Sequence, residues 1–229
     1  MEFIIISVGN ELLSGDITNT NATYIARRLT SKGHRVVRII TVPDDVDEIA
    51  NEIIEAKKKV DFVLVTGGLG ATHDDVTNEA VAKALNRKLV LYEDTYNLLK
   101  KKFPHINEEA LKKICMLPEG SEVINNDVGV APGYIIENIA VMPGVPAEME
   151  DVFEKILPRF GESEFYEDTL RIEGYEDRIL EQLNKIVKEF KDVQIGSYPK
   201  SGYVVIKFSG KDKKRVEEAK KKLAELLKI

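Results

Sequence analysis

The residues with the clearest chemical potential form one string at positions 66–75, which reads Thr-Gly-Gly-Leu-Gly-Ala-Thr-His-Asp-Asp. Glycines let a backbone approach a ligand closely and direct its amide groups at phosphate oxygens. Of the adjacent carboxylates Asp74 and Asp75, one is explained as the cap of the next helix. A second carboxylate there is typical of a divalent cation bridging to phosphate. The string therefore predicts a phosphate-binding loop, with ligand contacts from Gly67, Gly68, Gly70 and Thr72.

A second polar string covers positions 9–16 and continues at Asn19 and Asn21. Small and amide-bearing residues of this kind either form ordinary turns or hydrogen-bond a sugar, a base or a phosphate. The sequence leaves both interpretations open. The candidate ligand contacts in this region are Asn10, Ser14, Gly15, Asn19 and Asn21.

Proline-rich turns follow at 131–133 and 143–146, with Glu148 just beyond the second. Turn chemistry explains these residues by default. Rigid prolines at a strand end also build the rim of a binding pocket. We therefore retain Pro143, Gly144 and Glu148 as candidate contacts of a ligand.

Acidic residues outside the glycine string extend the candidate site. Asp44 and Asp45 end a predicted strand, and together with Glu11, Asp74 and Asp75 they make up to five carboxylates that could converge at one crevice. Such a cluster is costly without a metal or a role in proton transfer. We expect Asp74, Asp75 and Asp44 to hold a divalent cation (Mg²⁺, Mn²⁺ or Co²⁺, with K⁺ as an optional companion), and Asp45 and Glu11 to join the aspartates in catalysis. Asp45 also has a sufficient explanation as a helix cap.

The three histidines have different predicted roles. His73 lies inside the glycine string, and it is either a metal ligand or proton shuttle or a plain loop residue. His34 follows a glycine and is expected to cap the preceding helix. His105 follows a proline and is expected in a surface turn.

The elements that must position these residues alternate between strands and helices. Apolar runs predict strands at 3–8, 36–42 and 62–66, and apolar residues at helical spacing predict helices at 21–32, from 45 onward and at 77–85. Further helices are expected at 94–103, 107–116 and 147–155, with a hairpin at 134–136 and 139–142. This order predicts a mostly parallel sheet with helices on both faces, a three-layer α/β/α fold. In such sheets ligands bind beyond the carboxyl ends of the strands.

The tail predicts a separate unit. Apolar periodicity lapses at 158–163, and the order then becomes strand (165–172), helix (175–190), strand (193–198), strand (203–209) and helix (212–227). The apolar faces of these two helices suit one side of a three-stranded sheet, which gives a small α+β domain. We therefore expect domains at 1–160 and 165–229.

Composition narrows the class of protein. The 229 residues are 43% hydrophobic and 31% charged, without an apolar run long enough to span a bilayer and without the basic flank of a signal peptide. The only cysteine, Cys115, excludes an internal disulfide and is expected in the core, so we expect a cytoplasmic protein. Residues 1–164 carry a net charge of −9 and residues 165–229 one of +3, within a total of −6. This balance argues against a nucleic-acid partner, although the lysines of the last helix keep an RNA-binding tail as a low-ranking hypothesis.

The chain resembles the amino-terminal part of the CinA (competence/damage-inducible) proteins, members of the MoaB/Mog molybdopterin-binding superfamily. The matching strings lie at 9–15, 19–21, 33–34, 42–45, 66–70 with 74–77, 131–133 and 143–149. The tail, including Ser197-Tyr198-Pro199, is similar to the small KH-like middle domain of that family. Full-length CinA proteins also carry a carboxy-terminal amidohydrolase domain. The chain ends at Ile229 without it, so we do not expect deamidase activity.

The resemblance implies metal-dependent hydrolysis of the pyrophosphate in ADP-ribose or a related dinucleotide such as FAD. The superfamily also offers a rival, because its MoaB/Mog members bind molybdopterin and some adenylylate it. Their loop resembles Thr-Gly-Gly followed by Thr or Ser, where this chain has Leu69. Together with the doubled aspartate, that substitution favours the CinA type. A non-catalytic pterin- or nucleotide-binding module is a further alternative, and the family suggests a homo-oligomer, most simply a dimer.

Overall fold

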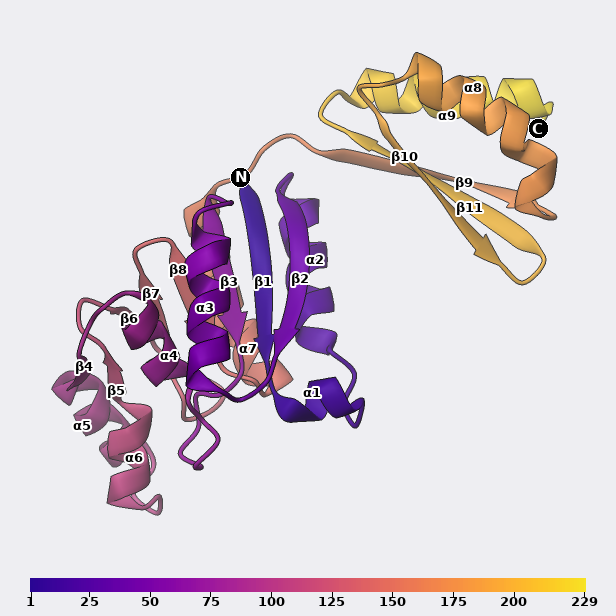
Figure 1. Ribbon diagram of the computed structural model, residues 1–229. Helices are drawn as coiled ribbons and strands as arrows, with labels where there is room; N and C mark the ends of the chain where they lie inside the picture. The colour runs from indigo at the N-terminus through magenta and orange to yellow at the C-terminus, as the bar shows by residue number, and fades with distance from the viewer. The chain divides into compact units, whose positions relative to one another are not determined.

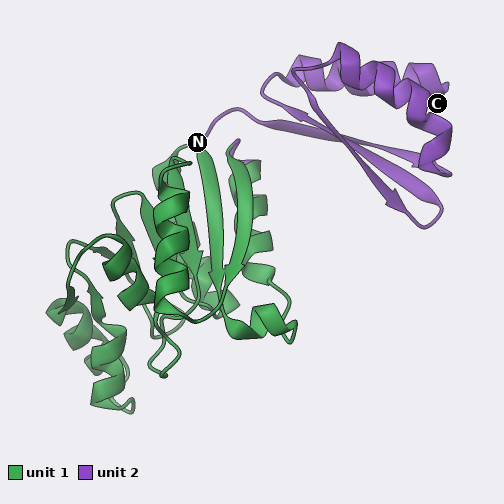
Figure 2. Cartoon of the chain, viewed as in Figure 1, with its two compact units in different colours: residues 1–30, 34–161 green, residues 31–33, 162–229 purple.

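The computed structural model describes all residues from 1 to 229, and the chain divides into two compact units (Figure 2). The first unit comprises residues 1–30 and 34–161, and the second comprises 31–33 and 162–229. The sequence boundaries of 1–160 and 165–229 fall within a few residues of this division.

The first unit is built on a six-stranded sheet with the order β2-β1-β3-β8-β7-β6 (Figure 1). The strands that pair in parallel are β1 (Glu2–Val8), β2 (Arg35–Val42), β3 (Phe62–Thr66) and β8 (Ile139–Met142). Two antiparallel strands complete the far edge, β7 (Gly133–Ile136) and β6 (Glu122–Ile124). The sheet is therefore mostly parallel, as the sequence predicted.

Helices cover both faces of this sheet. One core contains Phe3 and Ile5 of β1 and the apolar stripes of α2 (Thr20–Ser31) and α7 (Pro146–Ile156). The other contains Ile4 and Ile6 of the same strand together with α3 (Val46–Lys57) and α4 (Thr77–Ala84). Successive side chains of a strand point to opposite faces, so β1 supplies both cores. The predicted three-layer arrangement is confirmed.

The remaining elements of the first unit lie around this framework. They are α1 (Asn10–Ser14), β4 (Leu89–Leu91), α5 (Glu93–Lys102), α6 (Glu108–Ile114), β5 (Met116–Pro118) and a 3₁₀ turn, η1 (Leu157–Phe160). The sequence did not predict α1, the short β4–β5 ladder or β6. These elements have only three to five residues, too few to show a period in the sequence.

Two expectations about local roles were wrong. Helix α4 begins at Thr77 after Val76, which makes no side-chain cap bond, so neither Asp74 nor Asp75 caps this helix. The His34 side chain does not cap α2 either. It is buried against Phe3 and Phe160, and its Nε2 lies 3.0 Å from the carbonyl oxygen of Gly161.

The second unit is a three-stranded antiparallel sheet with the order β10-β11-β9. Its elements are β9 (Tyr166–Glu173), η2 (Glu176–Ile179), α8 (Leu180–Glu189), β10 (Gln194–Lys200), β11 (Tyr203–Gly210) and α9 (Lys213–Leu227). Apolar residues of both helices pack with alternate residues of β11 in one core, as the sequence predicted. Across the whole chain, no helix has both the length and the apolarity needed to cross a membrane.

Candidate functional site

A cleft of about 550 Å³ opens beyond the carboxyl ends of the central strands. It is lined by Ser7 and Val8 from β1, by Thr66 from β3 and by the turn that follows β8. Strand β1 lies between β2 and β3, so the connections leaving β1 and β2 run in opposite directions across the sheet. Ligands of open α/β sheets bind at such a switch point.

Most of the predicted site residues meet at this cleft. The candidates that line it are Glu11, Asn19, Asn21, Asp44, Gly67, Gly68, Gly70, Asp74, Asp75, Pro143, Gly144 and Glu148. The candidates outside its lining are Asn10, Ser14, Gly15, Asp45 and Thr72.

Local structure explains why these five residues lie outside. The Asp45 carboxylate accepts hydrogen bonds from the amides of Asp47 and Glu48, so it caps α3. Asn10 and Ser14 belong to α1, and Gly15 ends that helix with a left-handed φ of 81°. Thr72 turns its amide and hydroxyl toward Asp75.

The backbone of the glycine string requires glycine at its first two positions. Gly67 and Gly68 have φ values of 110° and 66°, which other residues adopt only with strain. A Cβ at Gly67 would overlap the Val8 carbonyl oxygen, and one at Gly68 would overlap the Thr77 hydroxyl. That hydroxyl donates to the carbonyl oxygen of Gly67 at 2.8 Å and closes the loop onto the start of α4. The loop is therefore a pre-formed backbone surface.

The two aspartates after the glycines have different surroundings. Asp75 is partly buried and accepts from the Thr72 amide at 2.8 Å and from the Thr72 hydroxyl. Asp74 is exposed, and hydrogen bonding from Thr72, which it shares with Asp75, is the main cause that lowers its pKa. The loop is also tied to α6, because the Lys113 ammonium donates to the Thr72 carbonyl oxygen. The lowered pKa favours the ionised form of Asp74.

The side chains of Asn19 and Asn21 hold the start of α2 in place. Asn19 donates to the Ser7 hydroxyl at 2.9 Å and accepts from the Ala22 amide at 3.0 Å. Asn21 donates to the Thr66 hydroxyl at 3.1 Å and to the Gly144 carbonyl oxygen at 2.7 Å. Asn19 therefore joins the end of β1 to the start of α2, and Asn21 joins α2 to the end of β3 and to the turn after β8.

Glu148 also lines the cleft, and its carboxylate is held by the segment that carries Asn126. Its Oε2 accepts from the Asn126 amide at 3.1 Å, and its carboxylate fills the space where a Cβ of Gly129 would lie. Burial raises the pKa of Glu148, and the hydrogen bond from Asn126 offsets part of this effect. Burial therefore favours the protonated form of Glu148 more than that of an ordinary glutamate.

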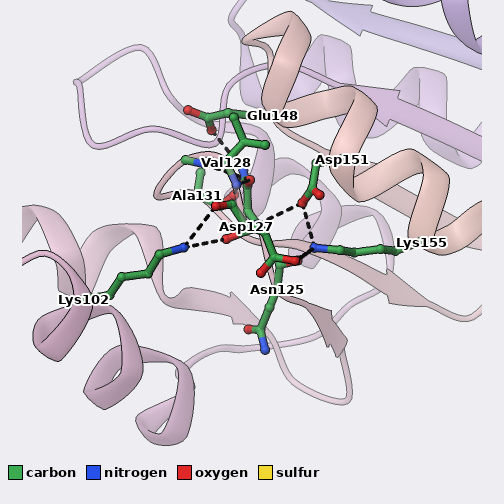
Figure 3. A network of polar contacts seen from close by, with 10 residues as sticks. Lys102, Asn125, Asp127, Val128, Ala131, Glu148, Asp151 and Lys155 are labelled. Atoms are coloured by element: carbon green, nitrogen blue, oxygen red, sulfur yellow. Dashed lines mark hydrogen bonds and ion pairs between the residues drawn. The ribbon is translucent and has the colours of Figure 1, made fainter.

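A network of polar contacts holds the segment 125–131 that carries Asn126 (Figure 3). Lys155 donates to the Asn125 carbonyl oxygen at 2.8 Å and to the carboxylates of Asp127 and Asp151, both at 2.7 Å. Lys102 approaches the carbonyl oxygens of Asn126 and Asp127 at 3.3 Å. The wall beside Glu148 is therefore held to both α5 and α7.

The predicted carboxylates share the cleft but do not form a compact metal-binding group. Glu11, Asp44, Asp74, Asp75 and Glu148 line the cleft, yet no group of three or more acidic, histidine or cysteine side chains is placed to hold a metal ion. Asp44 also accepts from the Asn10 amide at 2.8 Å. Of the five carboxylates that the sequence suggested could converge, four therefore reach the cleft, and Asp45 does not because it caps α3. The pair Asp74 and Asp75 remains suited to a hard cation only when other oxygens complete its coordination.

Several relevant residues escaped sequence analysis. Asn126 and Lys113 act through partners far along the chain, and nothing local marks them. Ile17 and Val145 line the cleft as apolar side chains, which sequence reasoning did not consider. His73 does not line the cleft, and its side chain is 98% exposed.

Fold and site together define an α/β protein with a glycine-rich loop beside a cleft at the switch point of its sheet. Residues 4–162 match the model of a family described as probable molybdopterin binding domain, and residues 164–229 match one described as FAD synthase, middle domain. The chain therefore belongs to the family of probable molybdopterin binding domains.

Known relatives add a resemblance to CinA. A protein of Archaeoglobus fulgidus is 60% identical, covering 99% of this chain and 98% of that protein. A CinA-like protein of Thermosipho melanesiensis is 37% identical, covering 98% of this chain but only 58% of the relative. The crystal structure of CinA from Thermoplasma acidophilum, described as having unknown function, is 37% identical with a TM-score of 0.66 and covers 69% of this chain and 96% of that one. The predicted similarity to CinA is confirmed.

Proposed function

We propose that the chain hydrolyses the pyrophosphate bond of ADP-ribose or of a related dinucleotide such as FAD. The observation that carries this proposal is the glycine string with its paired aspartates, Asp74 and Asp75, at the switch-point cleft. Backbone amides there suit phosphate oxygens. The adjacent aspartates suit a divalent cation that accompanies the phosphates.

The negative charge of the cleft favours a substrate that binds together with a cation. Acidic side chains line the cleft, and none of its lining residues is a lysine, an arginine or a histidine. A pyrophosphate entering alone would meet repulsion at this site. Mg²⁺ is commonly held by one or two carboxylates plus substrate phosphates, which fits the pair Asp74 and Asp75. When bound, such a cation neutralises phosphate charge and lowers the pKa of a coordinated water; Mn²⁺ or Co²⁺ could replace it, and K⁺ could assist.

The chain's own residues then have distinct roles. The amides of Gly68 and Gly70 stabilise the charge that develops on the non-bridging oxygens. The Gly67 amide, which the sequence also suggested as a donor, is used within the fold, because it donates to the Met142 carbonyl oxygen at 3.1 Å. Asp74 and Asp75 would hold the cation that accompanies the phosphates. Glu148, whose pKa is raised, is suited to carry a proton during turnover. Asn19 and Asn21, through their bonds to Ser7, Thr66 and Gly144, support the part of the cleft that holds the rest of the substrate.

A second function is favoured by the family match over residues 4–162. In that case the same cleft binds molybdopterin, either adenylylating it or holding it without turnover for a partner. Both functions place phosphate oxygens at the glycine string. They differ in the product, and a homodimer is our proposal for the assembly in either case.

Incubation of the full chain with ADP-ribose, FAD, or ATP plus molybdopterin, each with Mg²⁺, Mn²⁺ or Co²⁺, separates the two functions. Chromatography should find AMP and ribose 5-phosphate from ADP-ribose, or AMP and FMN from FAD. Adenylylated pterin, or pterin binding without any hydrolysis, would instead assign the chain to the molybdopterin function.

A further inference from the structure

Two large apolar side chains lie exposed at the cleft, and no contact with phosphate explains them. Ile17 is 57% exposed and Val145 is 56% exposed, and both line the cleft. We call this pair the apolar rim. Apolar surface gains free energy only when it is removed from water. Two such side chains beside the same cleft therefore favour an apolar surface on whatever enters it.

The backbone holds the apolar rim in place. The Ile17 amide donates to the Glu11 carbonyl oxygen at 3.2 Å, and Val145 occupies the cap position of α7, directly before Pro146. Asn21, the second residue of α2, donates to the Gly144 carbonyl oxygen at 2.7 Å and so holds the start of α2 against the turn that carries Val145. Little ordering is therefore left to be done when a ligand covers the rim.

The polar and the apolar residues of the cleft suit different ends of a ligand. The glycine string and its aspartates suit oxyanions with a cation, whereas the apolar rim offers no polar side chain. A cleft of about 550 Å³ is of the size that encloses a nucleotide-sized ligand. We infer that the apolar rim binds the planar heteroaromatic ring of the ligand while its phosphates lie at the glycine string. This inference rests on the proposed function only in assuming a ring-bearing phosphorylated ligand.

Titration calorimetry of the full chain with Mg²⁺ tests the inference. AMP and 6-hydroxymethylpterin serve as ring probes for the two sources of such a ring, and inorganic pyrophosphate serves as the ringless probe. The Ile17→Ser and Val145→Ser variants should each raise the Kd of whichever ring probe binds by about tenfold, while the Kd of pyrophosphate changes by less than about twofold.

Matched controls come from apolar residues of similar exposure outside the cleft. Leu13 in α1 is 53% exposed and Ile39 in β2 is 50% exposed, and neither lines the cleft. Leu13→Ser and Ile39→Ser should leave both ring and pyrophosphate binding unchanged. If these controls weaken ring binding as much as the rim variants do, the inference is overturned. The loss of affinity would then come from any exposed apolar residue that is made polar and not from the rim.

Three further results would also overturn it: neither ring probe binds, ring binding is unaffected by both rim variants, or pyrophosphate binding is weakened as much as ring binding. Sedimentation velocity tests the alternative that a second copy of the chain, and not a ligand, covers the rim. If Ile17→Ser dissociates an oligomer without changing ring affinity, the rim is a contact between copies of the chain. Failure of hydrolysis is a separate outcome: rim-dependent ring binding without cleavage of ADP-ribose removes the proposed hydrolase and keeps the inference.

Discussion

Replacing Asn126 with alanine should destabilise the first unit more than any nearby polar change. Asn126 is 5% exposed, and its side chain accepts from the amides of Val128 and Gly129 at 3.0 and 2.9 Å. It also donates to the Ala131 carbonyl oxygen at 3.0 Å and to Glu148 at 3.1 Å. Alanine leaves all of these groups without that partner.

The expected cost follows from this number of bonds. A hydrogen bond contributes about 1 kcal/mol net, and a buried group left unpaired costs about 1–3 kcal/mol. Three backbone groups therefore give a loss of about 3 kcal/mol. For a unit of this size the loss corresponds to a fall in Tm of about 6–12 °C.

Scanning calorimetry of the full chain measures this difference, and Asn125→Ala is the matched control. The Asn125 side chain is exposed, and only its carbonyl oxygen takes part in the network (Figure 3). We expect a change below about 0.5 kcal/mol for this control, as is usual for surface substitutions. If Asn126→Ala costs less than about 1 kcal/mol, or no more than Asn125→Ala, the explanation of the wall beside Glu148 is wrong.

Three further predictions concern other parts of the first unit. Lys113→Met should lower kcat for ADP-ribose by about tenfold, because it removes the hydrogen bond that ties the glycine loop to α6. Lys112→Met removes only an ion pair with Glu108 and should leave kcat unchanged. Equal rates for the two variants in steady-state assays would contradict this prediction. Burial lowers the pKa of His34 from 6.5, so only the unfolded chain gains a proton just below that pH. Stability should therefore fall as the pH falls from about 6.5 to 5.5, and His34→Gln should flatten this slope in urea titrations. Cys115 is buried with its pKa raised to about 11, so a thiol reagent should modify it only after unfolding, and rapid labelling of the folded chain would refute its place in the core.

The sequence predicted the framework of the site because its signals are local. Buried strands such as β1 and β3 are continuous apolar runs. The glycines that follow them mark turns whose backbone needs a positive φ. Those features were enough to place the cleft at the strand ends and to bring most candidate residues to it.

The rest depends on packing between distant segments. Asn126 reaches Glu148 across 22 positions and Lys113 reaches Thr72 across 41, and no spacing rule reveals such pairs. The gathering of carboxylates was predicted only in part for a similar reason, because four of them line the cleft but no three are placed to hold a metal ion. Strand ends bring residues to one edge of a sheet, but side-chain partners such as the Asn10 amide at Asp44 decide where each carboxylate points.

Single-turnover cleavage of ADP-ribose with Mg²⁺ tests the central claim most directly. The wild-type chain should form AMP and ribose 5-phosphate, and Asp74→Asn and Asp75→Asn should each slow the chemical step by about a hundredfold or more while the far-UV spectrum stays unchanged. Cleavage by both variants at the wild-type rate would contradict the account, because the paired aspartates would then have no part in handling the phosphates.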